Sequence, residues 1–225
     1  MRSFAILFAL FGCVFCHAQD TIRKRAVEEF QLKVFVGAGA AFNNGFGINS
    51  SLRENGFVSM QPVHANITTG LHFFNQHIDI DLGYDLLVNG CSNDETKLRT
   101  ISNGFKLRAH YEVFVFKKFN IGAGFNIGYS NTKLLLFRKG HQVDFNDGTG
   151  IEGNQLTLFL ERGVLGPSVS VRVKDHGRES ESVKITASYE LGITDKSWES
   201  NYFELENDIR ESRLRQFVLN VIFDL

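Results

Sequence analysis

The sequence predicts an all-β protein: an eight-stranded antiparallel transmembrane β-barrel of up-and-down topology. Three observations predict this fold. Apolar and polar residues alternate in eight separate segments, which is the period of a strand with two different faces. Short and long connections between these segments mostly alternate along the chain. This is expected of an antiparallel meander, in which successive turns lie at opposite ends. The chain also begins with a segment typical of exported proteins.

The first predicted element is a signal peptide over residues 1–18. Arg2 gives it a positive start, residues 4–15 are apolar, and Ala18 precedes the expected cleavage before Gln19. An apolar run of about 12 residues is short of the ~20 that a membrane helix needs. A lipoprotein signal ending at Cys13 is the alternative.

Residues 19–30 are predicted to be a short periplasmic segment, and residues 31–225 to be the barrel. The eight strands are expected at residues 32–42, 63–73, 78–88, 105–115, 119–129, 165–174, 183–193 and 215–225. The third alternates most clearly, with Asp79 and Asp81 on its polar face. The eighth is less regular, because Val218 and Ile222 fall in its polar row.

Three connections are short and four are long. The short ones are residues 75–76, 117–118 and 175–181, and the long ones are 43–62, 89–99, 131–163 and 195–211. We expect the short turns in the periplasm and the long loops outside the cell. The connection 131–163 contains two apolar stretches that would extend its flanking strands beyond the membrane as a hairpin. If these stretches cross the membrane instead, the barrel has ten strands.

Alternation alone does not assign the two faces, because a soluble barrel has the same period with the rows exchanged. The interior of an eight-stranded barrel is barely wide enough for its side chains, and the apolar rows are too bulky for it. Glycines in the polar rows would relieve crowding there: Gly70, Gly83, Gly104, Gly122, Gly124 and Gly128. Aromatic residues gather beside the short turns, like a membrane-interface girdle: Phe73, Phe74, Phe114, Phe116 and Phe119. We therefore expect the apolar rows to face lipid; a soluble exported lipid-binding barrel is the alternative.

The polar rows are expected to fill the interior with ion pairs and hydrogen bonds. The predicted members of this network are Asp79, Asp81, Asp85, Lys106, Arg108, His110, Glu112, Arg172, Lys184 and Glu190. Because eight strands leave no channel of porin size, a diffusion pore is not expected.

No catalytic, cofactor or metal site is predicted. His64 and His141 would lie near the outer rim, but their spacing from Ser59, Asp144 and Asp147 marks no triad. An enzyme that modifies outer-membrane lipid through such a histidine is the alternative function. The histidines at 64, 72, 77 and 110 supply no recognised ligand set. A net charge of −1 gives no reason to expect nucleic acid as a partner.

The long loops are the expected place for specific contacts. Trp198, Tyr202 and Phe203 lie in an acidic loop and are candidate contacts for a protein partner, a glycan, or divalent ions that bridge lipopolysaccharide. The alternative is a solvated loop whose aromatic residues fold onto the rim. Cys91 is the one cysteine after the signal peptide, so no internal disulfide is expected.

The signal ending in Ala-Gln, the segment FNIGAGFNIGYS and the alternating last strand resemble small bacterial outer-membrane barrels of the OmpA/OmpX type. More narrowly, they resemble the "outer membrane protein beta-barrel domain" group, which includes PorT-like and porin-family proteins. The resemblance covers the whole mature chain as a pattern, without fixed functional motifs. It implies a Gram-negative cell envelope, contact with outer-membrane lipid and lipopolysaccharide, and no enzymatic activity. The implied role is membrane integrity, adhesion, or service as an accessory to an outer-membrane machine.

The same resemblance implies that barrel-assembly machinery recognises the last strand. The outward residues of that strand are Phe217, Leu219, Val221, Phe223 and Leu225. The family usually ends in an aromatic residue, whereas this chain ends in Leu225 with Phe223 two positions before it.

Overall fold

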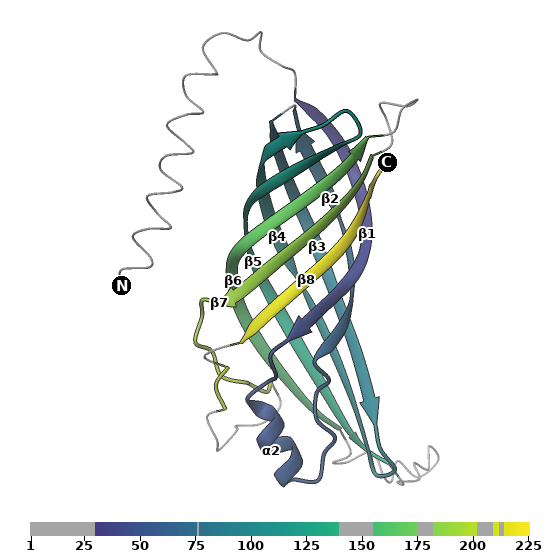
Figure 1. Ribbon diagram of the computed structural model, residues 1–225. Coiled ribbons are helices and arrows are strands. Elements are labelled where there is room, and N and C mark those ends of the chain that lie inside the picture. The colour runs from purple at the N-terminus through teal and green to yellow at the C-terminus, as the bar shows by residue number, and fades with distance from the viewer. Residues whose placement is uncertain (1–29, 76, 140–154, 175–181, 202–208, 212–213) are drawn as a thin grey trace. The chain divides into compact units, whose positions relative to one another are not determined.

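The protein folds as a closed antiparallel barrel of eight strands, each paired with its neighbours in the sequence. The computed structural model describes residues 30–75, 77–139, 155–174, 182–201, 209–211 and 214–225. The strands are β1 (Gln31–Asn43), β2 (Val63–Phe74), β3 (Ile78–Ser92), β4 (Thr96–Val115), β5 (Phe119–Arg138), β6 (Gln155–Lys174), β7 (Ser182–Gly192) and β8 (Arg215–Asp224) (Figure 1). The predicted fold class is confirmed, and the ten-strand alternative is wrong. The predicted signal peptide and cleavage site lie outside the described residues.

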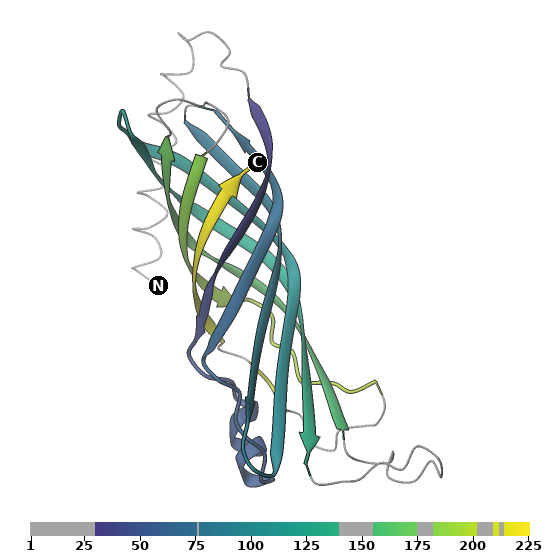
Figure 2. The ribbon, with the colours of Figure 1, turned by 90° about the vertical axis from the view of Figure 1, so that its right-hand side faces the viewer.

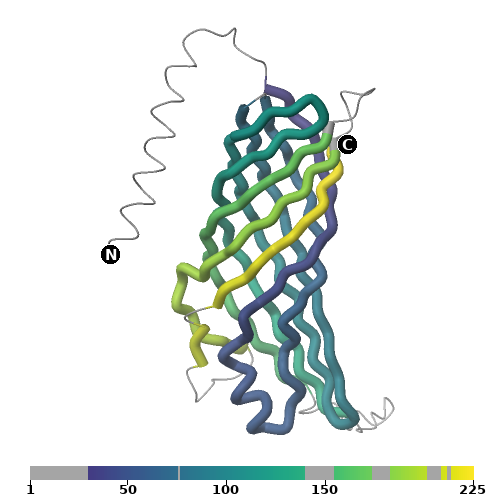
Figure 3. The backbone as a smooth tube through the Cα atoms, viewed as in Figure 1, coloured from purple at the N-terminus to yellow at the C-terminus, as the bar shows by residue number. Residues whose placement is uncertain are grey.

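Pairing of the first and last strands closes the barrel. β8 runs antiparallel to β1 from the pair Phe35–Asp224 to the pair Asn43–Gln216, and Figure 3 shows the two strands side by side. Leu225 also donates its backbone N–H to the carbonyl of Val34 at 2.8 Å. In lipid every backbone polar group needs a partner within the protein, and closure supplies these partners by removing free sheet edges.

Of two long connections that extend the strands, one differs from the prediction and the other confirms it. The expected loop 89–99 is instead a continuation of β3 and β4, joined by residues 93–95. Asn93 makes the tight turn possible because its Oδ1 accepts hydrogen bonds from the N–H groups of Glu95 (3.1 Å) and Thr96 (2.6 Å). In the connection 131–163, β5 continues to Arg138 and β6 begins at Gln155, so the predicted extension of this hairpin is confirmed.

A short helix, α2 (Ile48–Glu54), lies in the connection between β1 and β2 and was not anticipated from the sequence. Its buried residues are Ile48 and Leu52, which lie four positions apart and therefore on one face. Figures 1 and 2 show α2 beyond the ends of β1 and β2, beside the extended strands. We call this end of the barrel the long-loop end, and the opposite end the short-turn end. Within the described residues, no helix is long and apolar enough to cross a membrane.

The two faces of the wall have the polarity of a transmembrane barrel. On β3 the outward residues Ile78, Leu82 and Val88 are 37–46% exposed, whereas the inward Asp79 and Asp81 are fully buried. The soluble lipid-binding alternative requires the reverse arrangement and is therefore wrong. The outward apolar row from residue 78 to 88 spans about 34 Å along the strand. At a tilt of ~45° this becomes about 24 Å, close to the ~25 Å apolar band of outer-membrane barrels.

The polarity of the wall inverts at the long-loop end. On β4 the outward residues there are Lys97, Arg99, Ile101 and Asn103, three of them polar, while Leu98 points inward and is 1% exposed. The inward leucines of the extended strands pack with α2 and with residues of the other long connections. This buried cluster, which we call the cap, consists of Phe46, Ile48, Leu52, Met60, Leu98, Leu134, Leu136, Leu158, Leu160, Trp198 and Leu214. The same strands thus line a polar interior in one part and an apolar core in another.

Glycines in the inward rows serve two purposes. A Cβ on Gly122 would lie 2.6 Å from Ser170 Oγ across the crowded interior, as the sequence suggested. A Cβ on Gly124 would instead lie 1.8 Å from the backbone oxygen of Ala109, and one on Gly70 would lie 2.1 Å from that of Leu82. At these two positions, glycine permits neighbouring strands to approach closely where the wall curves.

Candidate functional site

The interior of the barrel brings together all ten polar residues that the sequence assigned to it. Each is at most 7% exposed. They are Asp79, Asp81 and Asp85 from β3, Lys106, Arg108, His110 and Glu112 from β4, Arg172 from β6, and Lys184 and Glu190 from β7. Every second side chain of a strand points to the same face, so the alternation along each strand directs these charges into the interior.

Asp85 and Glu190 organise the middle of the network. Asp85 Oδ1 accepts a hydrogen bond from Arg108 Nη2 at 2.9 Å, and its Oδ2 lies 2.9 Å from Lys106 Nζ. Lys106 also donates to Glu190 Oε1 at 2.7 Å, which links β3, β4 and β7 across the barrel. Asn126 donates to the same oxygen of Glu190 at 2.7 Å. Each carboxylate therefore has several donors, as a buried charge requires.

A second group closes the short-turn end. Arg172 of β6 pairs with Glu112 of β4, and Asn120 donates a hydrogen bond to the same carboxylate. The guanidinium of Arg172 also lies 4.6 Å from the centre of the Phe74 ring, a cation–π arrangement, and donates to the backbone carbonyl of Asn75 at 3.3 Å. These contacts place side chains across the end of the interior beside the β2–β3 turn.

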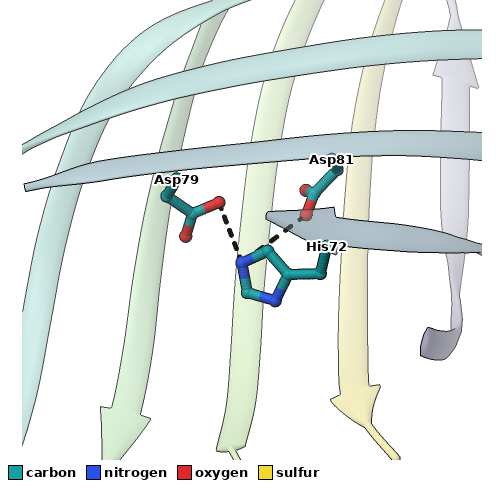
Figure 4. A group of neighbouring side chains, drawn as sticks. All are labelled: His72, Asp79 and Asp81. Atoms are coloured by element: carbon teal, nitrogen blue, oxygen red, sulfur yellow. Dashed lines mark ion pairs between the residues drawn. The ribbon is translucent and has the colours of Figure 1, made fainter. Parts of the chain in front are cut away.

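A third group, the His72 cluster, lies between the β2–β3 hairpin and β7 and β8. It consists of His72, Asp79, Asp81, Lys184 and Asp224. His72 Nδ1 is 2.8 Å from Asp224 Oδ1, and its Nε2 faces Asp79 at 3.2 Å and Asp81 at 3.8 Å (Figure 4). Lys184 Nζ pairs with Asp79 and lies 2.8 Å from Asp81 Oδ2.

A small cavity lies among the charged residues of the interior. A cavity lined by Asp85, Lys106, Arg162, Glu190 and Gln216 has a volume of ≈ 10 Å³, which is room for about one water molecule. The cap lies beyond it at the long-loop end. Along the barrel axis, the polar side-chain clusters of the described residues are thus followed by the apolar cap.

Glu211 joins the connections at the long-loop end. Its carboxylate accepts hydrogen bonds from the N–H groups of Gly47 (2.8 Å) and Ile48 (3.0 Å), at the start of α2. It also accepts one from Trp198 Nε1 at 2.9 Å. Trp198 is 2% exposed, so it packs in the cap and cannot serve as the surface contact that the sequence suggested. Burial of the large apolar surface of its indole ring stabilises the cap. The other two candidates, Tyr202 and Phe203, lie outside the described residues.

A surface hollow of ≈ 270 Å³ lies beside the extended part of β6. It is lined by Asn131, Phe159, Glu161, Lys196, Ser197, Glu199 and Asn201. The connection between β7 and β8 forms one wall, because Phe159 and Glu199 exchange backbone hydrogen bonds of 2.7 and 2.9 Å. The lining combines an aromatic ring, amides and both signs of charge, which suits a polar ligand such as a sugar or a peptide.

The rim histidine shows no catalytic arrangement in the part of the chain that the structure describes. His64 is 3% exposed, its Nε2 lies 3.2 Å from the backbone carbonyl of Gln61, and its ring packs against Phe46. The backbone carbonyl of Ser59 accepts a hydrogen bond from the thiol of Cys91 at 3.1 Å. His141, Asp144 and Asp147 lie outside the described residues.

Several network residues were missed in the sequence. They are His72, Asn126, Arg162, Gln216, Asn220 and Asp224. Gln216, Asn220 and Asp224 fall on the polar row of the last strand, so the same alternation would have identified them. Arg162 lies in a stretch that we assigned to a loop, and Glu211 lies outside any strand.

Comparisons with known proteins do not name a family. No protein-family model and no curated protein sequence matches the chain. Among solved structures, Ail, the attachment invasion locus protein of Yersinia pestis, aligns with a TM-score of 0.46 and 6% identity, covering 88% of this chain and 100% of Ail. Neisserial surface protein A aligns with a TM-score of 0.44 and 12% identity, covering 88% and 100%. The N-terminal β-barrel domain of Pseudomonas aeruginosa OprF aligns at 0.38 and 11%, covering 87% and 100%. At these values, the similarities assign neither a family nor a role.

Proposed function

We propose that this chain is an integral outer-membrane protein of a Gram-negative envelope, exported by its signal peptide, with a structural or surface-interaction role rather than a catalytic one. The observation that carries the proposal is the pairing of an outward apolar band with a filled interior. A protein built this way gains its stability from lipid contact, and an interior of interlocked ion pairs leaves no route for a diffusing solute.

In this proposal the long-loop end faces outside and presents the functional surface. The extended strands and the cap form a rigid support for the connections around the hollow beside β6. Glu161, Lys196 and Glu199 are exposed there and provide polar contacts for a partner or a glycan. Lys97 and Arg99 lie just beyond the apolar band on β4, where they suit the phosphates of lipopolysaccharide.

The narrower proposal, by resemblance, is a PorT-like accessory to a larger outer-membrane machine. Recognition by barrel-assembly machinery belongs to the same proposal. It is supported by the outward residues of the last strand, since Phe217, Leu219, Phe223 and Leu225 are 40–69% exposed.

The test is complementation of a strain that lacks the protein. A variant with Glu161→Lys and Glu199→Lys changes the hollow. The matched control reverses two charges in the β4–β5 turn, with Lys117→Glu and Lys118→Glu. Both variants are expected to insert normally, and only the first to lose surface attachment or envelope integrity. If only the turn variant fails, the periplasmic side carries the role and an accessory function is favoured over surface contact.

The pore and enzyme alternatives have their own measurements. Purified protein in planar bilayers is expected to give no steady conductance, because the interior is filled. The lipid A of cells that overproduce the protein is expected to keep its mass. A reproducible change in lipid A mass that is lost with His64→Ala would contradict the proposal and establish the enzyme alternative.

A further inference from the structure

We propose that His72, Asp79 and Asp81 form a binding site for one divalent first-row metal ion, with Zn²⁺ as the best fit. One donor atom from each residue lies within 4.8 Å of the other two. All three side chains are buried, and Figure 4 shows both aspartates directed toward the histidine ring. One imidazole nitrogen and two carboxylate oxygens are a common ligand set for such ions in proteins.

The polar atoms that face this point have unused bonding capacity. Across the described residues, His72 Nε2, Asp79 Oδ2 and Asp81 Oδ1 have no hydrogen-bond partner. Nε2 does lie 3.2 Å from Asp79 Oδ1, but without the angles of a hydrogen bond. His72 Nε2 and one oxygen of each aspartate are therefore available to a further ligand.

Asp224 prepares His72 for this role. Its Oδ1 lies 2.8 Å from His72 Nδ1, so a proton on Nδ1 is held by the carboxylate. The lone pair of the neutral ring then lies on Nε2, which faces Asp79 and Asp81. A carboxylate behind a metal-binding histidine fixes the ring in this way in many metal sites.

The charges of the cluster also suit a divalent cation. Asp79 and Asp81 share one ammonium group, Lys184, and Asp224 adds a third carboxylate beside the other ring nitrogen of His72. Lys184 contacts one oxygen of each of Asp79 and Asp81, namely Asp79 Oδ1 and Asp81 Oδ2. Asp79 Oδ2 and Asp81 Oδ1 accept no hydrogen bond from Lys184. The competitor is a proton on Nε2, which would supply only one positive charge.

The ligands come from both strands of one hairpin. His72 and Asp81 are cross-strand partners in the β2–β3 register, and Asp79 lies two residues from Asp81 on the same face. No metal site was expected from the sequence, because the histidines along single strands supply no recognised ligand set, whereas this ligand set spans a turn. Because the site is buried, the metal would enter while the barrel folds.

The experiment is refolding of the mature chain in detergent with one equivalent of Zn²⁺, removal of loose metal with citrate, and elemental analysis of the folded fraction. We expect about one Zn²⁺ per chain in the wild type and in the control His110→Gln. His110 is also a buried interior histidine, with its Nε2 2.9 Å from Ser168 Oγ, but it is no ligand in the proposed site. His72→Gln and Asp81→Asn are expected to lose the metal. Asp224→Asn is expected to bind it ~10–100-fold more weakly.

A sample refolded with Co²⁺ tests the ligands by the visible absorption of the bound ion. Visible absorption bands are expected in the wild type and in His110→Gln, and they should be absent in His72→Gln. A wild-type barrel that retains neither Zn²⁺ nor Co²⁺ after refolding would overturn the proposal, and so would equal metal content in His72→Gln and His110→Gln.

Lys184→Met keeps the test informative if the ligand variants do not fold. Loss of the ammonium leaves Asp79 and Asp81 without their cation, so this variant should fold poorly in EDTA and recover with Zn²⁺. Mg²⁺ at the same concentration is the control and should not restore it. Recovery at low pH but not with Zn²⁺ would show that the cluster binds a proton alone, and would overturn the metal site.

Discussion

Trp198 and Glu211 are joined by a hydrogen bond of 2.9 Å between the indole Nε1 and the carboxylate Oε1, inside the apolar cap. The same carboxylate accepts the backbone N–H groups of Gly47 and Ile48. One acidic side chain therefore ties the connection between β7 and β8 to the start of α2, which belongs to the connection between β1 and β2.

We predict that Glu211→Ala loosens the cap without unfolding the barrel. The change leaves buried N–H donors without an acceptor, at a cost of about 1–3 kcal/mol. Amide exchange at Gly47 and Ile48 should accelerate, while the heat-dependent gel shift of the barrel stays the same. Trp198→Phe is the control, since it keeps an aromatic side chain in the cap and removes only the indole donor to Glu211, and it should have a smaller effect. Unchanged exchange at both amides would contradict this role of Glu211.

Asp85→Asn is predicted to be among the most damaging changes in the interior. Asp85 compensates Arg108 and Lys106, and a broken buried ion pair costs about 3–5 kcal/mol. Urea-dependent unfolding in detergent should show this loss. The double variant Asp85→Asn, Lys106→Met should recover part of it, because fewer positive charges then remain unpaired. A double variant less stable than Asp85→Asn would argue against charge compensation as the cause.

Gly124→Val should prevent normal closure of the wall. A Cβ at this position would lie 1.8 Å from the backbone oxygen of Ala109, so β4 and β5 would have to separate. We expect a loss of about 2 kcal/mol or more in unfolding free energy. Ala123→Val is the matched control, because Ala123 is exposed on the outward row next to it. Equal stability of the two variants would show that the close approach does not constrain the wall.

A charge in the apolar band is predicted to be costly only within the depth of the membrane. Leu82 is 46% exposed near the middle of the outward row of β3, and Leu82→Arg should cost about 2–4 kcal/mol in lipid vesicles. Asn103→Arg, on the outward row of β4 where the polarity changes, should cost about 0–1 kcal/mol. Folding equilibria in vesicles of known thickness measure both. Similar costs at the two sites would show that the lipid-facing apolar band does not end between Leu82 and Asn103.

Phe223→Ala is predicted to reduce assembly in cells several-fold while leaving refolding in detergent nearly normal. Phe223 is 47% exposed on the last strand, so its ring contributes little to internal packing. The measurement compares the amount of heat-modifiable protein in membranes with the yield of refolding. Ile222→Ala is the contrasting variant: its side chain is fully buried, so it should lower both quantities.

Much of the barrel could be predicted from the sequence because lipid imposes a strict period of two. Wherever one face met lipid and the other met the polar interior, as from Ile78 to Val88, the strand was identified with its correct orientation. The ten predicted network residues all face the interior for the same reason.

The long-loop end was predicted less well, because water and an apolar core exchange the two rows there. Lys97 and Arg99 fall in the predicted connection 89–99, although they lie on the outward row of β4. The pairing of His72 with Asp81 could not be read from single strands, since it depends on the register across a turn. The burial of Trp198 depends on Glu211, thirteen positions away, and no local pattern relates the two.

The inversion of polarity along β4 also sets the height at which the protein sits in its bilayer. A displacement of two residues moves a strand by about 7 Å, or roughly 5 Å along the membrane normal at a tilt of ~45°. Such a shift in one direction would draw Arg99 and Asn103 toward the acyl chains, and in the other it would lift Phe105 and Leu107 into the headgroups. The long strands thus oppose movement of the protein along the membrane normal. The protein should therefore match one bilayer thickness better than thinner or thicker ones.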